Sequence, residues 1–166
     1  MIAPFTLIKQ FSSYFLGLYL HFKQEYVKFA QSSTEEDAAM PLARISVPSH
    51  LPTGKIRALA DAVQDGLVTT CEIPPKDRFQ LITRFVPDDM IIDPTFPDVE
   101  RTADASIVEI TMVRRSTQAQ KDRLYKRIVS LAEEAGFVGD DILISISEND
   151  RGDWSAGRGE SYASGS

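Results

Sequence analysis

The sequence predicts an α/β (α+β) fold in which two βαβ units form one four-stranded sheet with two helices on one face. The first observation is an apolar strand, helix and strand pattern that occurs twice, at an offset of roughly 65 residues. The second is that Asp77-Arg-Phe-Gln and Asp141-Ile-Leu-Ile occupy the same place in each half. The third is composition: 166 residues, 43% apolar and 25% charged, suit one domain with a hydrophobic core.

The first unit is expected to contain a strand at 42–47, a helix at 55–70 and a strand at 78–86. The first strand alternates apolar and polar residues, and the helix carries apolar residues at three- and four-residue steps. The helical stripe consists of Ile56, Leu59, Ala60, Val63 and Leu67. The second strand offers three large apolar side chains to a core: Phe79, Leu81 and Phe85.

The second unit follows a loop at 87–105 that is rich in proline and aspartate and is expected to be solvated. A strand is expected at 106–113. A helix at 117–135 follows, with Thr117 as its N-cap, and a final strand is expected at 142–146. Two units of this kind place both helices on one face of the sheet. The other face then stays uncovered and apolar, which predicts a homo-oligomer.

Residues 1–39 differ from the domain at 40–166 and are expected to form an N-terminal extension. They hold eight of the fifteen aromatic residues, at the spacing of an amphipathic helix, and a polar linker follows at 31–37. No run approaches the roughly 20 apolar residues of a transmembrane helix. No convincing cleavage site marks a secretory signal either, so a cytoplasmic protein is expected.

Two interpretations of this extension stay open. Its helix could dock through residues 5–29 on a membrane surface, which is the less favoured contact, or on a partner protein. Alternatively, the assigned start is too early and translation begins at Met40.

Charge and composition exclude several classes of function. Asp and Glu number 24 against 18 Lys and Arg, for a net charge of −6, which disfavours nucleic acid as a partner. The single cysteine, Cys71, cannot form an internal disulfide. His21 and His50 lack metal-ligand spacing. No metal and no cofactor are therefore expected.

Four short motifs occur in a fixed order along the domain. They are Met40-Pro41-Leu42, Asp77-Arg78-Phe79-Gln80, Arg114-Arg115 and Asp153-Trp154-Ser155-Ala156-Gly157-Arg158-Gly159. Together they resemble the tautomerase superfamily, most closely the malonate semialdehyde decarboxylase group and related tautomerases. The resemblance extends from Met40 to about Tyr162, and it implies a tautomerase-like fold and a trimer.

The resemblance also implies roles for individual residues. Pro41 would be the N-terminal residue after removal of Met40, with its free secondary amine as the reactive group, which slightly favours Met40 as the start. Arg114 would bind the substrate carboxylate or polarise its carbonyl through a planar guanidinium. Asp77 would orient water or the proline, although Asp141 in the second half shows that it could equally be a turn residue.

The second arginine of the decarboxylase pattern has no direct match in this chain. That pattern has two arginines separated by a proline. Here Arg114 matches the first, Arg115 falls on the proline, and Ser116 takes the place of the second. Arg115 is kept as a substrate-binding candidate with Ser116 as the alternative, and Trp154 is expected to line the pocket.

The implied function is a cofactor-free enzyme that acts on small oxo or enol carboxylic acids. A neutral Pro41 amine can shuttle a proton in a tautomerisation, or it can form an iminium that assists decarboxylation of a malonate-semialdehyde-like substrate. A proline nitrogen inside a peptide bond can do neither. The alternative is a catalytically silent oligomeric binding protein, whose Pro41 is capped by the N-terminal helix docking on a membrane or partner.

Overall fold

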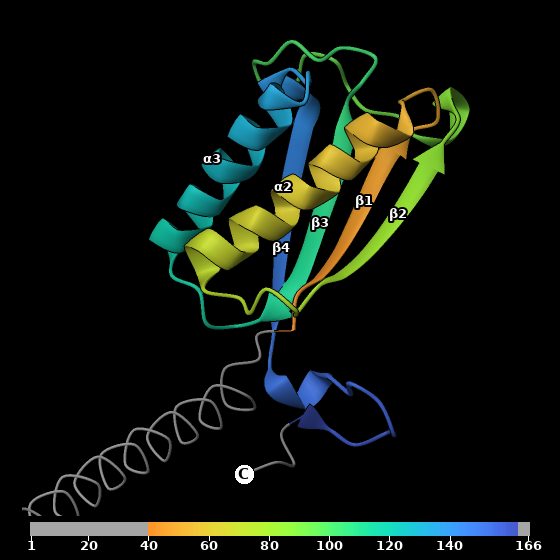
Figure 1. The fold of residues 1–166 in the computed structure, drawn as a ribbon. Coiled ribbons are helices and arrows are strands. Elements are labelled where there is room, and N and C mark those ends of the chain that lie inside the picture. Colours follow the sequence, from red (N-terminus) through yellow and green to blue (C-terminus); the bar gives the residue numbers. More distant parts are fainter. Residues whose placement is uncertain (1–39, 163–166) are drawn as a thin grey trace, which may run out of the picture. The chain divides into compact units, whose positions relative to one another are not determined.

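The computed structural model describes residues 40–162 (Figure 1). The amphipathic helix and linker predicted within residues 1–39 lie outside the described residues. Across the described part of the chain, no helix is long and apolar enough to span a bilayer.

Four strands form one mixed sheet: β1 (Leu42–Pro48), β2 (Phe79–Phe85), β3 (Ser106–Val113) and β4 (Ile142–Asn149). The strand order is β2-β1-β3-β4. β1 is parallel to β2 and β3 is parallel to β4, while β1 and β3 pair antiparallel in the centre. The two predicted βαβ units and the single four-stranded sheet are confirmed.

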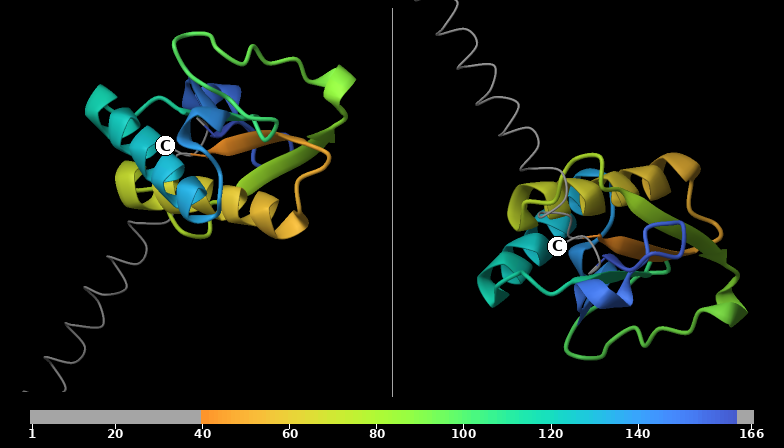
Figure 2. Two further views of the ribbon diagram at one scale, coloured as in Figure 1. Left: turned by 90° about the horizontal axis from the view of Figure 1, so that it is seen from above. Right: turned by 90° about the horizontal axis from the view of Figure 1, so that it is seen from below.

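Two helices, α2 (Thr53–Cys71) and α3 (Gln118–Glu134), lie on the same face of the sheet (Figure 2). The predicted N-cap of α3 is confirmed: the Thr117 hydroxyl accepts a hydrogen bond from the backbone N–H of Gln120 in a capping box. Gly136 follows α3 with a φ of 85°, a conformation that glycine adopts without strain.

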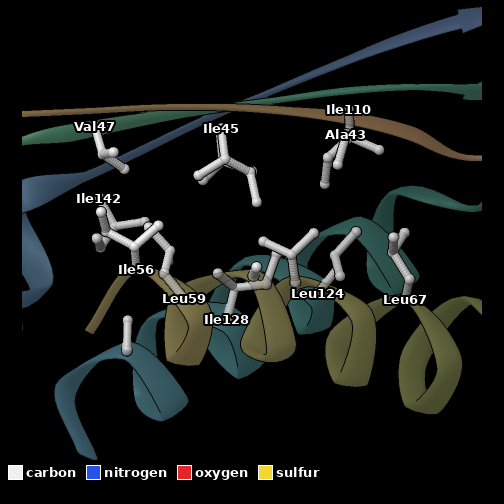
Figure 3. Packing of buried hydrophobic residues seen from close by; sticks show 14 of the residues in the cluster. Ala43, Ile45, Val47, Ile56, Leu59, Leu67, Ile110, Leu124, Ile128 and Ile142 are labelled. Carbon is white, nitrogen blue, oxygen red and sulfur yellow. The ribbon is translucent and has the colours of Figure 1, made fainter. Parts of the chain in front are cut away.

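The core lies between the sheet and the helices (Figure 3). The apolar stripe predicted for the first helix is buried, and Cys71 at the end of α2 is buried with it. The largest fully buried side chains from the helices and central strands include Ile45, Ile110, Leu59, Leu67, Leu124 and Ile128. Burial of each such side chain contributes about 1.5–3 kcal/mol before the entropy of folding is counted.

One expectation about β2 is wrong. Phe79 and Leu81 do not enter the core; each is 53% exposed. Side chains alternate along a strand, and it is Ile82 that packs against the core. Phe79 and Leu81 therefore lie on the face of the sheet without helices, where a partner chain was expected.

β4 is three residues longer than its apolar pattern predicts. Ser147, Glu148 and Asn149 continue the strand and pair with Thr111, Met112 and Val113 of β3. A pattern of apolar residues cannot detect a polar strand end. The extension matters because it carries Glu148 and Asn149 to the edge of the sheet where β1 begins.

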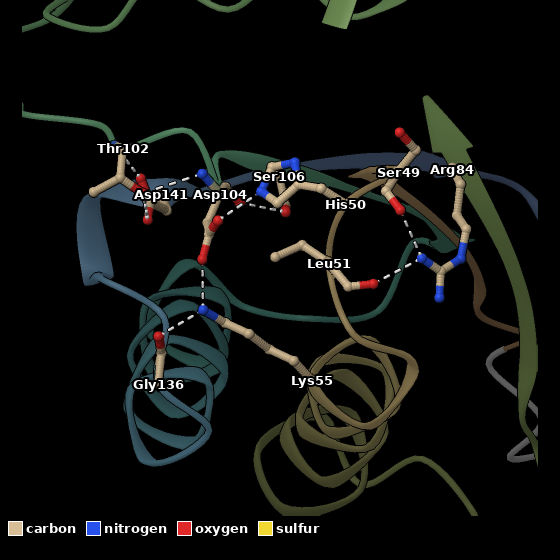
Figure 4. Close-up of polar contacts among 10 residues, drawn as sticks. All are labelled: Ser49, His50, Leu51, Lys55, Arg84, Thr102, Asp104, Ser106, Gly136 and Asp141. Atoms are coloured by element: carbon tan, nitrogen blue, oxygen red, sulfur yellow. Dashed lines mark hydrogen bonds and ion pairs between the residues drawn. The ribbon is translucent and has the colours of Figure 1, made fainter. Parts of the chain in front are cut away.

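Polar contacts tie the loop at 87–105 to the opposite edge of the sheet (Figure 4). Asp141, fully buried, accepts hydrogen bonds from Thr102 through the backbone N–H (2.6 Å) and the hydroxyl (2.7 Å). Asp104 pairs with Lys55 (2.6 Å) and His50 (2.9 Å). Asp141 is thus a structural residue of the second unit.

Candidate active site

Both pairs of parallel strands contribute to one edge of the sheet. β1 and β2 begin there, and β3 and β4, which run in the opposite direction, end there (Figure 1). The residues just outside these four strand ends therefore lie along one line. In sheet order they are Asp77, Pro41, Arg114 and the segment that leads to Trp154.

Pro41 is buried immediately before β1. Since side chains alternate along a strand, it falls on the helix-covered side with Ala43. In the full chain its nitrogen belongs to the peptide bond with Met40. Met40 is itself buried and has a φ of 44°, a left-handed conformation that is costly for a residue with a side chain.

Asp77 lies directly against the junction of Met40 and Pro41. The backbone N–H of Met40 donates a hydrogen bond to Asp77 Oδ2 at 3.1 Å. Asp77 Oδ1 is buried and has no hydrogen-bond partner among the described residues. Burial raises the pKa of the Asp77 carboxyl, and the Met40 N–H only partly opposes this. Asp77 can therefore hold or transfer a proton beside Pro41.

A buried glutamine holds the turn that carries Asp77. The Gln64 amide on α2 donates to the backbone carbonyls of Pro75 and Asp77, each at 3.4 Å. Gln64 is not among the residues predicted for the site, although the sequence holds a signal for it. Gln64 falls between Val63 and Leu67 on the buried stripe of α2, where an apolar residue is usual.

Arg114 follows β3, and a backbone hydrogen bond holds it in place. Its N–H donates to the Asn149 carbonyl at 2.9 Å, which extends the pairing of β3 with β4. Its side chain is 65% exposed, and Nη1 lies 4.0 Å from Oε2 of Glu148. Arg115 is exposed and Ser116 is half-buried. Burial therefore does not distinguish between them as the second residue that contacts the substrate.

Glu148 was also missed, because it lies in the polar end of β4. Its side chain is only 12% exposed, and Oε2 accepts a hydrogen bond from Lys121 Nζ of α3 at 2.7 Å. Its other oxygen, Oε1, is buried without a hydrogen-bond partner in the described part of the chain.

Trp154 is half-buried at the same edge. Its indole N–H donates to the Asn149 side-chain oxygen at 2.6 Å. The backbone N–H of Tyr162 donates to the Trp154 carbonyl at 2.9 Å, which closes the segment at 154–162 on itself.

The structure therefore joins the predicted site residues in two groups. Asp77 contacts the Met40–Pro41 junction, and Arg114 contacts the Asn149–Trp154 segment; no ion pair joins Asp77 to Arg114 within residues 40–162. An exposed guanidinium, a half-buried carboxyl and a proline at one edge suit proton transfer on a small carboxylate. Among the described residues no cluster of three or more His, Cys, Asp or Glu is placed to hold a metal ion.

Comparison with known proteins also indicates similarity to enzymes of the tautomerase type. A family model described as a tautomerase enzyme matches residues 77–157. A probable tautomerase of Bacillus subtilis (strain 168), YrdN, is 30% identical over 122 residues, which cover 73% of this chain and 94% of that protein.

Solved structures of similar fold include two decarboxylases. The FG41 malonate semialdehyde decarboxylase inhibited by 3-bromopropiolate is 34% identical, with a TM-score of 0.68 over 72% of this chain and 91% of that one. A second malonate semialdehyde decarboxylase, solved also with its first residue, proline, replaced by alanine, is 26% identical, with a TM-score of 0.67 over 72% and 92%. A fused 4-OT symmetric trimer, 17% identical with a TM-score of 0.61 over 74% and 96%, shares the fold.

Proposed function

This chain belongs to the tautomerase family, and on that premise we propose that its reactive group is the secondary amine of Pro41, present when Pro41 is the first residue. The protein is an enzyme of the tautomerase superfamily. Its proposed substrates are small oxo or enol carboxylic acids, which it tautomerises or, for a malonate-semialdehyde-like acid, decarboxylates.

The observation that carries the proposal is the contact of Asp77 with the residue before Pro41. The Asp77 carboxyl, whose pKa is raised and whose Oδ1 has no partner in the part of the chain that the structure describes, lies within hydrogen-bond distance of the Met40 backbone. When Met40 is absent, Oδ2 loses this donor, and the N-terminal amine of Pro41, the next residue along the chain, would replace it. Asp77 would then orient the amine or a water molecule beside it.

In a tautomerisation, each group has a defined task. Arg114 binds the substrate carboxylate. The neutral Pro41 amine takes a proton from an enol oxygen or from the carbon next to the carbonyl, and it returns that proton to the other position. The substrate and product differ only in the place of one proton and one double bond.

In a decarboxylation, the amine condenses with the aldehyde of a 3-oxo acid and releases water. The bond between the carboxylate and the adjacent carbon then breaks, and its electron pair moves into the iminium to give an enamine and CO2. Protonation of the enamine carbon and hydrolysis release the aldehyde and restore the amine.

We also include in the proposal a trimer, as in the fused 4-OT structure, with the helix-free face of the sheet turned toward other subunits. The exposed Phe79, Leu81 and Leu143 on this face support an interface between copies. The alternative of a catalytically silent binding protein is less favoured, because YrdN is a probable tautomerase and the solved structures of 34% and 26% identity are decarboxylases.

The test compares a chain that begins at Pro41 with the full chain. The shorter chain is expected to turn over enol phenylpyruvate or malonate semialdehyde between pH 5 and 9, and the full chain is expected to be inactive. Pro41→Ala in the shorter chain should lower kcat at least a hundredfold, because loss of a general acid–base typically costs about 10²–10⁴. Intact mass verifies the first residue of each preparation. Equal activity of both chains would overturn the role of the amine.

A further inference from the structure

Glu148 and Lys121 are two charged residues that no step of the proposed mechanism uses. Glu148 lies 4.0 Å from Arg114, and Lys121 bonds Glu148. Glu148 is the second-last residue of β4 and pairs with Met112, which is fully buried. Its side chain is therefore on the helix-covered side of the sheet, the side to which Pro41 belongs. A carboxylate placed there would compete with a substrate carboxylate for any nearby cation.

Two cations are within reach of this carboxylate, but they are not equivalent. Lys121 Nζ is 2.7 Å from Oε2, a charge-assisted hydrogen bond, and its side chain is only 18% exposed. Arg114 Nη1 is 4.0 Å from the same oxygen, too far for a hydrogen bond. Lys121 therefore neutralises Glu148, and within residues 40–162 no carboxylate is hydrogen-bonded to the guanidinium of Arg114.

The second carboxylate oxygen of Glu148, Oε1, indicates which contact Glu148 would make if Lys121 were absent. Oε1 is buried and has no partner among the described residues, so the carboxylate has capacity for a second donor. A buried, unpaired carboxylate is costly, and Arg114 is the other cation recorded within 4.0 Å of it among the described residues. Without Lys121, Glu148 would recruit the guanidinium that a substrate needs.

We propose that Lys121 is a positioning residue that binds Glu148 and thereby keeps Arg114 available for the carboxylate of a small oxo acid. The proposal deepens the proposed function, because it rests on Arg114 as the carboxylate-binding residue. It concerns substrate binding and does not require the amine of Pro41. The role of Lys121 and the role of the Pro41 amine can therefore be refuted separately.

Trp154 provides a readout that does not depend on turnover. It is the only tryptophan of the chain. Its indole bonds the side chain of Asn149, and the carbonyl of Asn149 accepts the N–H of Arg114. Binding of a carboxylate at Arg114 should therefore change the tryptophan fluorescence. Titration with pyruvate, with uncharged pyruvamide as the reference ligand, gives a Kd for the full chain and for the chain that begins at Pro41.

The decisive experiment is a double-mutant cycle. Lys121→Met should weaken pyruvate binding about tenfold, within the usual range for coupling between sites. Glu148→Gln alone should bind pyruvate at least as tightly as the parent, because it removes the competitor. The double variant K121M/E148Q should recover to within about twofold of the parent. It also contains no unpaired carboxylate, so it is expected to fold even if Lys121→Met does not.

Lys55→Met is the matched control. Lys55 is 16% exposed and bonds the carboxylate of Asp104 at 2.6 Å (Figure 4). It lies at the start of α2, which follows the end of β1, whereas the candidate site lies where β1 begins. Its loss should lower the melting temperature without changing the Kd for pyruvate.

Several results would overturn the proposal. They are unchanged binding in Lys121→Met, a double variant no tighter than Lys121→Met, weaker binding in Glu148→Gln, or no pyruvate binding by either form of the parent. If the cycle behaves as expected but the chain that begins at Pro41 turns over no substrate, the positioning role stands and the proposed function fails.

Discussion

At the scale of single residues, the two aspartates that precede β2 and β4 occupy equivalent positions in the sequence but have different surroundings in the structure. Both follow a helix and come before a strand, as their matching sequence strings predict. Asp141 is completely buried and both its oxygens accept hydrogen bonds from Thr102. Asp77 accepts a hydrogen bond from the Met40 N–H, and its other oxygen has no partner within residues 40–162. A carboxyl group with an unsatisfied oxygen contributes little to stability, and it is a good candidate for a catalytic role.

Asp77→Asn tests this contrast through pH dependence in the full chain. Burial raises the pKa of Asp77 in the folded state, so the folded chain holds this proton more tightly than the unfolded chain does. The parent therefore loses stability as pH rises from about 4, the ordinary value, through the raised value. The variant lacks this loss, so its melting temperature should exceed that of the parent at pH 7 and approach it near pH 3.

Thermal denaturation at both pH values measures the difference. A variant that is less stable than the parent at pH 7 would show that the bond from Met40 outweighs burial. In the chain that begins at Pro41, the same substitution should reduce turnover, which is the usual trade between stability and function at a site.

At the scale of secondary-structure elements, the two helices pack through a glycine. A Cβ added at Gly66 of α2 would lie 2.8 Å from Leu124 Cδ1 and 3.0 Å from Ile128 Cγ1 of α3. Both partners are fully buried in the core and have little room to shift. Gly66 therefore sets how closely α2 approaches α3.

Gly66→Ala should destabilise the protein by about 1–3 kcal/mol, because the added methyl overpacks the contact between the helices. Urea unfolding at a fixed protein concentration measures the change. Gly54→Ala in the same helix is the control: no atom lies within 4 Å of its added Cβ, and its effect should stay within about 1 kcal/mol. Equal effects of the two substitutions would contradict the packing argument.

The start of α3 offers a second comparison. Thr117→Ala removes the hydroxyl of the capping box and should cost about 1 kcal/mol in urea unfolding. Thr69→Ala removes a threonine hydroxyl inside α2 that bonds only the Asp65 carbonyl one turn earlier. That variant should stay within about 0.5 kcal/mol of the parent. A larger loss in Thr69→Ala than in Thr117→Ala would refute the importance of the cap.

At the scale of the whole molecule, the uncovered face of the sheet is the main unsatisfied feature. Helices cover one face, while Phe79, Leu81 and Leu143 leave large apolar side chains exposed on the other. Exposed apolar side chains on an uncovered sheet face are typical of an interface.

Leu81→Glu should dissociate the proposed trimer, because burying a new charge in an interface carries a large desolvation cost. Light scattering during size-exclusion chromatography should show the mass of three 18.5 kDa chains for the parent and a smaller assembly for the variant. Val138→Glu alters a similarly exposed apolar residue between α3 and β4, away from the sheet face. It should leave the mass unchanged. A parent that elutes as a single chain would remove the trimer from the proposal.

Local patterns predicted the elements well, and the places where they failed share a cause. The stripe of α2, the cap at Thr117 and the order of strands and helices follow from periodicity and capping chemistry. The same reasoning misplaced Phe79 and Leu81 and ended β4 before Glu148. Alternation along a strand shows that two faces differ, but it does not show which face a helix covers.

The sequence by itself determined the family, the two βαβ units and the identity of Pro41, Asp77 and Arg114 as candidates, because these depend on residue type and spacing along the chain. Only the tertiary structure placed Asp77 against Met40, Gln64 beneath the turn at 74–77 and Lys121 beside Glu148. Each of these contacts joins residues that are far apart in the chain. Their strength depends on burial and on distances of a few ångströms, which arise only when the sheet and helices pack together.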